Sequence, residues 1–231
     1  MLTRILLPVA ALSLGGLAHG GPTAAPMVLS FERDAPGRPP RSFAFEVTGK
    51  GPAVKWEVRK DPTAPSGPNV LAQLGRAEGG DNFPLAVFDG TLLRGGDLSV
   101  RLKGVAGEED RAGGLLWRYK DRNNYYIVRA NALEDNVVLY RVKNGKRRPI
   151  APIGKPLSYG VKAKVPSAAW HALRVTFEGS RFVVYFNGER LFEAEDSALG
   201  EPGRVGLWTK ADSVTFFDDL AIGPLEKDPA R

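Results

Sequence analysis

The chain has 231 residues, with 32 Lys and Arg against 26 Asp and Glu, which gives a formal net charge of +6. Its hydrophobic fraction of 43% is ordinary for a soluble globular protein, and its length suits one large all-β domain or two small ones. The absence of cysteine excludes disulfides, thiolate metal sites and cysteine nucleophiles. The 27 glycines and 18 prolines are typical of a fold with many short strands and turns.

The first twenty residues have the features of a secretory signal peptide. Arg4 supplies a charged start, an apolar run extends from Ile5 to Leu17, and the small residues Ala18 and Gly20 precede an expected cleavage site. This run is too short to span a bilayer, which takes about 20 apolar residues, and no later run is long enough. We therefore expect a periplasmic or extracellular protein without a membrane span. The expected organisation is a signal peptide at 1–20, a spacer at 21–27, a single β-sandwich domain at 28–225 and a tail at 226–231.

Short strands are predicted along the first half of the chain. Alternation of apolar and polar residues indicates strands at 42–48 and 97–103. The segment 69–74 contains helix-favouring residues but is too short for a helix, so we expect a strand. Asp89-Gly90, between the apolar runs 84–88 and 92–93, predicts a tight hairpin. The remaining strands expected in this half are 27–32 and 54–59.

The middle of the chain predicts three successive strands, at 115–119, 125–130 and 137–142. Aromatic and β-branched residues dominate them, and the polar segments KDRNN and NALEDN separate them. Asn144-Gly145 then predicts a hairpin turn.

The last third continues the pattern after an irregular segment at 149–168. Strands are expected at 170–178 and 181–186, and Asn187-Gly188 predicts another tight turn. Further strands are expected at 189–195, 203–209 and 213–222. Many short strands and no helix predict an all-β fold: two antiparallel sheets packed face to face as a jelly-roll β-sandwich.

Three segments resemble known sandwich domains: GGLLWRYKDRNNYYIVRAN (113–131), WHALRVTFEGSRFVVYFNGERLFEAED (170–196) and GRVGLWTKADSVTFFDDL (203–220). They are similar to the concanavalin A-like, laminin-G-like domains. The greatest similarity is to the bacterial branch called 3-keto-disaccharide hydrolase-like, loosely family-sixteen glycoside hydrolase-like. The resemblance implies a curved two-sheet sandwich whose concave face holds sugar, in some members with a calcium ion at a sheet edge.

The carboxylates do not reproduce a glycosidase motif. Family-sixteen endoglucanases carry the pattern E-x-D-x-x-E or E-x-D-x-x-x-E on one strand, which is absent here; the nearest approach is Glu193 and Glu195 beside a hairpin. His171 is the only histidine outside the signal peptide, so a histidine-based metal site lacks ligands. We therefore expect a non-catalytic carbohydrate-binding protein. A hydrolase of glycosides or keto-disaccharides and a structural module of the cell envelope stay open as alternatives.

Candidate ligand-binding residues follow from the face of each predicted strand on which a side chain should lie, since successive side chains alternate between the two faces. We call this alternation parity. Sugar binding uses aromatic planes and planar polar groups, and a guanidinium is costly to bury unpaired. We expect one concave surface to contain Arg118, Tyr125, Arg129, Arg141 and Trp208. Internal carboxylates such as Asp121 or Glu134 could instead pair with these arginines.

Asp218 is the candidate metal ligand. By parity it points inward, where a carboxylate needs a cation, an Arg or backbone N–H groups. A structural hydrogen-bonding role is favoured over a calcium ion, because one or two acids are too few ligands. The basic segment KNGKRR (143–148) surrounds the Asn144-Gly145 turn, so a solvated turn is favoured there and nucleic acid is not expected as a partner.

Overall fold

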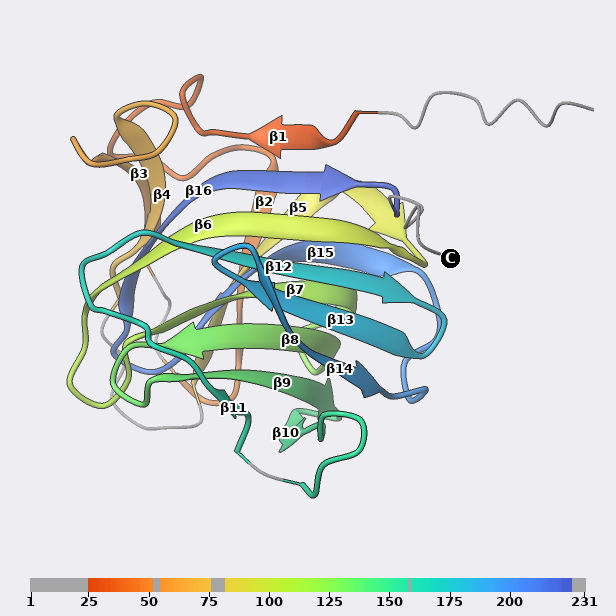
Figure 1. Cartoon of the computed structure of the whole chain (residues 1–231). Helices are drawn as coiled ribbons and strands as arrows, with labels where there is room; N and C mark the ends of the chain where they lie inside the picture. Colours follow the sequence, from red (N-terminus) through yellow and green to blue (C-terminus); the bar gives the residue numbers. More distant parts are fainter. Residues whose placement is uncertain (1–24, 52–54, 76–81, 158, 226–231) are drawn as a thin grey trace, which may run out of the picture.

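Two antiparallel sheets of eight strands each lie against one another (Figure 1). The computed structural model describes residues 25–51, 55–75, 82–157 and 159–225. The expected all-β, two-sheet sandwich is confirmed, and no helix occurs among these residues. It follows that this part of the chain has no helix able to cross a membrane. The expected signal peptide and the whole of the expected tail lie outside the described residues.

One of the two sheets, which we call sheet A, contains the last described strand of the chain. In spatial order its strands are β14 (Glu189–Glu195), β13 (Arg181–Phe186), β12 (His171–Glu178), β6 (Gly96–Ala106), β16 (Val214–Gly223), β4 (Asn69–Gln73) and β3 (Trp56–Lys60), with β1 (Met27–Leu29) paired to β16.

The other sheet, which we call sheet B, contains the three strands predicted in the middle of the chain, at 115–119, 125–130 and 137–142. In spatial order its strands are β10 (Lys146–Pro149), β9 (Asn136–Lys143), β8 (Asn124–Asn131), β7 (Ala112–Asp121), β15 (Gly203–Thr209), β5 (Phe83–Leu93) and β2 (Phe43–Thr48), with β11 (Val161–Lys162) paired to β9.

The main core fills the space between the two sheets. Trp117 on β7 shows how it is built: its ring lies 5.6 Å from that of Tyr126 in its own sheet and 5.8 Å and 5.4 Å from those of Phe177 and Phe182 in sheet A. These aromatic residues are almost fully buried. Large interlocking rings of this kind contribute much of the apolar burial that stabilises a fold.

Both Asn-Gly turns are confirmed as tight hairpins. Asn144 and Gly145 have φ of 53° and 74° between β9 and β10, and Asn187 and Gly188 have φ of 51° and 87° between β13 and β14. Positive φ at both central residues characterises the type I′ turn, whose twist matches that of the flanking strands.

The Asp89-Gly90 hairpin prediction is wrong. β5 continues through both residues as one strand of 11 residues, and the chain reverses only after Leu93. Residues of β5 pair with β15 up to Leu93, with a register shift opposite Gly203–Val205. Asp89 and Gly90 fall in this irregular stretch between Phe88 and Leu93, so the dipeptide lies in a bulge of the strand and not in a reversal of the chain.

The connection from β10 to β11 wraps around one edge of the sandwich. Pro152 forms a bridge with Ala194, and the Ile153 N–H donates to the Glu193 carbonyl, so this segment covers the free edge of β14. The same connection ends on sheet B, where the Asn136 amide donates to the Tyr159 carbonyl. Covering an edge strand in this way protects it from pairing with another chain. It also brings Tyr159 to the outer face of sheet B, against Tyr140.

Candidate functional site

Sheet B carries a second apolar cluster on its outer face, the face turned away from sheet A. Residues alternate between the two faces of a strand, so Trp117 enters the main core while Leu116 belongs to the second cluster. Every member is buried. The cluster consists of Phe83, Leu85, Val87, Ala112, Leu116, Tyr119, Tyr125, Ile127, Val138, Tyr140, Val142 and Trp208.

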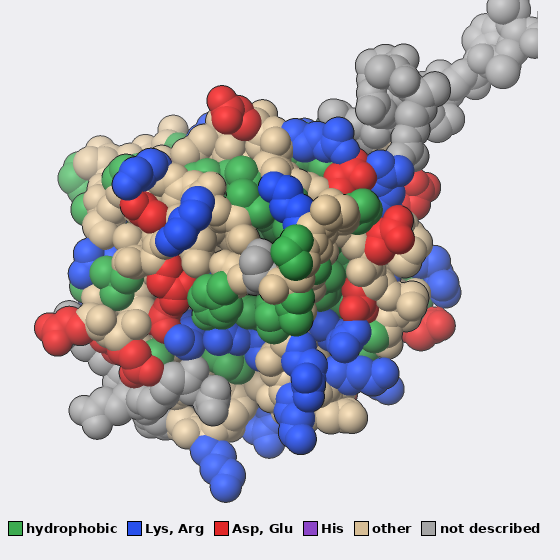
Figure 2. Space-filling view, turned by 60° about the horizontal axis from the view of Figure 1, so that its bottom comes forward, with side chains coloured by type: hydrophobic (Ala, Val, Ile, Leu, Met, Phe, Trp, Pro, Cys, Tyr) green, Lys and Arg blue, Asp and Glu red, His purple; other side chains and the backbone are tan. Residues whose placement is uncertain are grey.

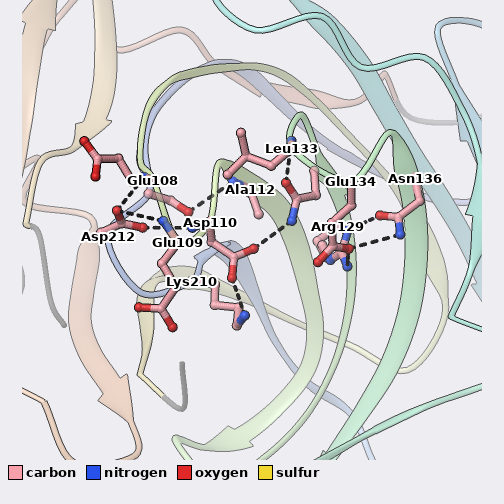
Figure 3. A network of polar contacts seen from close by, with 12 residues as sticks. Glu108, Glu109, Asp110, Ala112, Arg129, Leu133, Glu134, Asn136, Lys210 and Asp212 are labelled. Carbon is pink, nitrogen blue, oxygen red and sulfur yellow. Dashed lines mark hydrogen bonds and ion pairs between the residues drawn. The ribbon is translucent and has the colours of Figure 1, made fainter. Parts of the chain in front are cut away.

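A charged network lies at one end of this outer face (Figure 3). Arg129 on β8 is 1% exposed, and its guanidinium donates to the Glu134 carboxylate at 2.6 Å, to Asn136 and to the Tyr140 hydroxyl at 3.2 Å. Burial disfavours the charge, but Tyr140 and Glu134 outweigh it and hold the pKa of Arg129 above its ordinary value. The side chain of Glu134 is 32% exposed, so its carboxylate is the part of this network that solvent can reach.

Tyr159 covers the network from the solvent side. It is 51% exposed, its ring meets that of Tyr140 edge-on, and the Arg129 guanidinium lies 5.4 Å from its ring centre. Burial raises the pKa of Tyr159, but its hydrogen bond with Tyr140 and the charge of Arg129 outweigh this and lower that pKa below its ordinary value. The result is an accessible aromatic ring beside a charged, hydrogen-bonding group.

Arg147 on β10 lies across the aromatic part of the second cluster. Its guanidinium carbon is 4.5 Å from the Tyr140 ring centre, 4.6 Å from that of Phe83 and 5.7 Å from that of Trp208. Within the described part of the chain its buried Nη1 atom has no hydrogen-bond partner. Contact with ring faces partly compensates a buried cation.

A second polar network joins the neighbouring loops (Figure 3). Asp110 accepts from the Asn131 amide at 2.7 Å and pairs with Lys210, while Asp212 accepts from the backbone N–H groups of residues 108–110. Those N–H groups hold the pKa of Asp212 below its ordinary value although burial opposes them. Because Asn131 follows Arg129 by two residues on β8, both networks lie on the same face. This second network therefore fixes the loops that flank Arg129.

The structure brings three of the five candidate ligand-binding residues together. Tyr125, Arg129 and Trp208 all lie on the outer face of sheet B, as parity predicted. Tyr125 and Trp208 are 0% exposed, and the Tyr125 hydroxyl hydrogen-bonds Thr48 at 2.7 Å. They form the floor beneath Arg147 and are not themselves accessible.

The grouping of Arg118 and Arg141 with those three is wrong, because both point toward sheet A. Arg118 donates to the carbonyls of Arg94, Leu199 and Gly179, and its guanidinium lies over the rings of Phe177 and Phe182. A β-bulge with φ of 47° at Arg118 reverses the parity read from the sequence. Arg141 pairs with Asp196, beyond the end of β14 in sheet A.

The inward direction predicted for Asp218 is also wrong. Phe217 and Leu220 enter the core, with a register shift between Asp218 and Ala221, so Asp218 lies on the outer side of sheet A. It is buried and accepts from the N–H and hydroxyl of Ser66 and from the Asp219 N–H at 2.8 Å. Burial, opposed by these hydrogen bonds, raises its pKa to about 6. The described residues contain no group of three or more potential metal ligands, and a calcium ion at Asp218 stays an untested expectation.

Sequence reasoning missed most of the accessible part of the site. Tyr140 shares parity with Val138 and Val142, so its position on the outer face could have been read from β9. Tyr159 and Arg147 carried no such signal, because the first lies in an irregular segment and the second in a turn that reads as solvated.

Comparisons with known proteins agree with the fold. No family model matches the sequence, so the narrower resemblance to the 3-keto-disaccharide hydrolase-like branch stays a prediction. A levanase of Bacillus subtilis (strain 168) is 29% identical over 155 residues, which are 65% of this chain and 20% of that protein. The chain thus spans about a fifth of the length of this relative.

Among solved structures, the carbohydrate-binding module CBM66 of Bacillus subtilis is 20% identical with a TM-score of 0.59, covering 79% of this chain and 97% of that one. The cellulose-induced protein Cip1 is 13% identical with a TM-score of 0.61, covering 86% and 97%. A Bacillus licheniformis β-glucanase is 10% identical with a TM-score of 0.51, covering 89% and 100%. These likenesses show the concanavalin A-like jelly-roll fold.

Proposed function

We propose that the protein binds carbohydrate without cleaving it, through the accessible part of the outer face of sheet B. The observation that carries this proposal is the half-exposed ring of Tyr159, placed beside the Arg129–Glu134 pair. Sugar rings present C–H faces that pack on aromatic rings, and their hydroxyls hydrogen-bond to carboxylates and amides. Tyr159 supplies the ring, and the carboxylate of Glu134 supplies the accessible polar group.

The buried floor beneath these residues supports the proposal. A binding site works best when its groups are held in place by packing and hydrogen bonds rather than ordered by the ligand. Arg129, Tyr140 and the second apolar cluster hold the site rigidly on strands of sheet B. The similarity of part of the chain to a levanase, and of its fold to a carbohydrate-binding module, makes levan the first polysaccharide to test.

The carboxylates of this face support binding rather than hydrolysis. Glycoside hydrolysis requires a carboxylic acid of raised pKa together with a second carboxylate at a suitable distance. Over the described residues, the pKa is raised at the carboxyl groups of Asp34, in the β1–β2 connection, and Asp218, in sheet A. On the outer face of sheet B, Glu134 is paired with Arg129 and Asp110 with Lys210. We infer from this pairing that neither serves as a proton donor.

Affinity electrophoresis through gels containing levan, a mixed-linkage β-glucan or the acidic polymer polygalacturonate tests the proposal. Tyr159→Ala and Glu134→Gln should each weaken retention of the protein about tenfold. The first removes the ring that packs on the sugar, and the second removes the carboxylate charge but keeps an oxygen that accepts from Arg129. Tyr185→Ala is the matched control: Tyr185 lies on the outer face of sheet A and also contacts an arginine, with Arg174 4.8 Å from its ring centre. Wild-type retention in both site variants, or no retention of the wild type by any of the three gels, would overturn the proposal.

A further inference from the structure

Two turns at one end of sheet B lie side by side. The β7–β8 turn and the β9–β10 turn are joined by the Gly145 N–H, which donates to the Asn123 carbonyl at 3.0 Å, and by the Asn144 N–H, which donates to Asn124 Oδ1 at 3.1 Å. The two hairpins therefore present their tips as one surface, at the bottom of the view in Figure 1.

This surface gathers exposed cations without carboxylate partners. Five basic side chains flank the two turns, all exposed, and none forms an ion pair with a described carboxylate. Figure 2 shows Lys and Arg side chains collected beside the hydrophobic patch on this side of the molecule. We name this group the basic strip; it consists of Lys120, Arg122, Lys143, Lys146 and Arg148.

Strand register places like charges directly opposite one another within the strip. Lys143 on β9 pairs with Lys146 on β10. Cross-strand neighbours have Cβ atoms about 5 Å apart, and like charges in that position destabilise the sheet. The nearby carboxylate of Asp121 does not relieve this, because it caps its own turn by accepting from the Asn123 N–H at 2.8 Å and from the Asn124 amide at 2.9 Å.

Several arginines elsewhere on the surface are paired with carboxylates. Arg141 has Asp196, Arg174 has Asp97, and Arg181 has Glu193. The basic strip differs from these positions because five cations without a described carboxylate partner gather at two adjoining turns. An anion outside the chain would offset their mutual repulsion.

We propose that the basic strip binds an acidic polysaccharide, one with carboxylate groups on successive sugars, so that the carbohydrate recognised beside it is anionic. This inference rests on the proposed function and deepens it. Strands lie about 4.8 Å apart, so the strip crosses β7 to β10 over about 14 Å and suits a repeating polymer better than a single ion. β10 joins the two surfaces, because Arg147 faces the aromatic floor while Lys146 and Arg148 face the strip.

Nucleic acid fits the strip less well than an acidic glycan. Proteins that bind single strands combine a basic groove with aromatic rings on which bases stack. The basic strip contains no aromatic residue, and the exposed ring in the described connection from β10 to β11, Tyr159, belongs to the other side of β10. Exposed cations without an adjacent aromatic ring suit a polymer of acidic sugars.

The test uses the full chain with polygalacturonate and with its fully methyl-esterified form, which keeps the sugar backbone but has no charge. A triple variant, Lys143→Glu, Lys146→Glu and Arg148→Glu, reverses three charges of the strip. A control variant, Arg33→Glu, Lys60→Glu and Arg101→Glu, makes the same change in net charge at exposed positions outside it. Dissociation constants are measured at 50 and 200 mM salt, with single-stranded DNA as a further polyanion.

The expected result is at least tenfold weaker binding of polygalacturonate by the strip variant and less than a threefold change in the control. The salt dependence of the wild type should exceed that of the strip variant, since fewer counterions are displaced. Equal loss in both triple variants, equal wild-type affinity for the esterified polymer, or tighter binding of DNA would overturn the inference. Retention on neutral levan that depends on Tyr159, without binding of polygalacturonate, would overturn it while leaving the proposed function standing. Binding of polygalacturonate that depends on the strip but not on Tyr159 would overturn only the proposed site.

Discussion

Arg129 and Arg141 stand on adjacent strands of sheet B and point to opposite faces of it. Arg129 pairs with Glu134 on the outer face, whereas Arg141 pairs with Asp196 on the side of sheet A. Their separation follows from register, because Tyr126 is opposite Arg141 and Val138 is opposite Arg129. Two arginines that look equivalent in the sequence thus serve different surfaces, and only Arg129 belongs to the candidate site.

Arg129→Ala should destabilise the fold. Removing one partner of a buried ion pair typically costs 3–5 kcal/mol, and partial exposure of Glu134 reduces this, so we expect a loss of about 2–3 kcal/mol in the free energy of unfolding. Urea denaturation measures it. Arg148→Ala, an exposed position on β10, should change that free energy by less than about 0.5 kcal/mol. If the two variants unfold at the same urea concentration, the Arg129 network contributes no stability. Because of the expected loss, Arg129 is a poor position for testing sugar binding.

Gly188→Val should destabilise the β13–β14 hairpin by about 1 kcal/mol or more. Gly188 has φ of 87°, a region that a β-branched residue resists, while a Cβ at this position meets open space. The effect is therefore one of backbone conformation and not of packing. Gly200→Val is the matched control, since that glycine also faces open space but has no positive φ. Thermal unfolding should separate the two variants, and equal melting temperatures would contradict the turn geometry.

Asp218 should make stability depend on pH. Its pKa is raised to about 6 by burial, so between pH 4 and 6 the folded protein holds a proton that the unfolded chain releases. This contribution to stability is present at pH 4 and is lost as the pH rises through 6. Asp218→Asn cannot ionise and keeps an oxygen that accepts from Ser66 and Asp219, so it should be free of this loss.

The comparison is made by urea unfolding of wild type and Asp218→Asn at pH 4.5 and pH 7.5. Relative to wild type, the variant should gain stability at the higher pH, by at most about 3 kcal/mol for a shift of about two pKa units. A difference between the two proteins that is the same at both pH values would show that Asp218 does not titrate in this range.

The sequence could predict the sandwich because its signals were local. Asn144-Gly145 and Asn187-Gly188 mark turns by backbone chemistry alone, and the alternation around Trp117 and Tyr126 assigns core positions correctly. The failures occurred where strands are irregular. A bulge at Arg118 and a register shift after Asp218 each moved a side chain to the face opposite to the one that simple alternation predicts. Parity therefore placed Tyr125, Arg129 and Trp208 correctly on regular stretches but could not place these two.

The accessible part of the site could not be predicted for a different reason. Tyr159 comes from a segment with little regular structure, and its position depends on the path of the chain from the edge of β14 to sheet B. Such a path is set by tertiary contacts far apart in the sequence, which no local pattern records. The position of Arg147 could not be predicted either. The sequence around it is typical of a solvent-exposed turn and gives no sign of the aromatic rings that the side chain contacts.

Arg147→Ala should destabilise the outer face of sheet B, whereas Arg148→Ala should not. The two arginines are neighbours on β10, but Arg147 lies over the rings of Tyr140, Phe83 and Trp208 and Arg148 is exposed on the other side. A desolvated contact between a cation and an aromatic ring is worth up to about 2 kcal/mol. Removing the guanidinium also uncovers Trp208, so acrylamide should quench tryptophan fluorescence more strongly in Arg147→Ala. We expect a loss of about 1–2 kcal/mol in the free energy of unfolding for this variant, measured with urea, and less than about 0.5 kcal/mol for Arg148→Ala. Equal unfolding midpoints and unchanged quenching would show that Arg147 does not cover the aromatic floor.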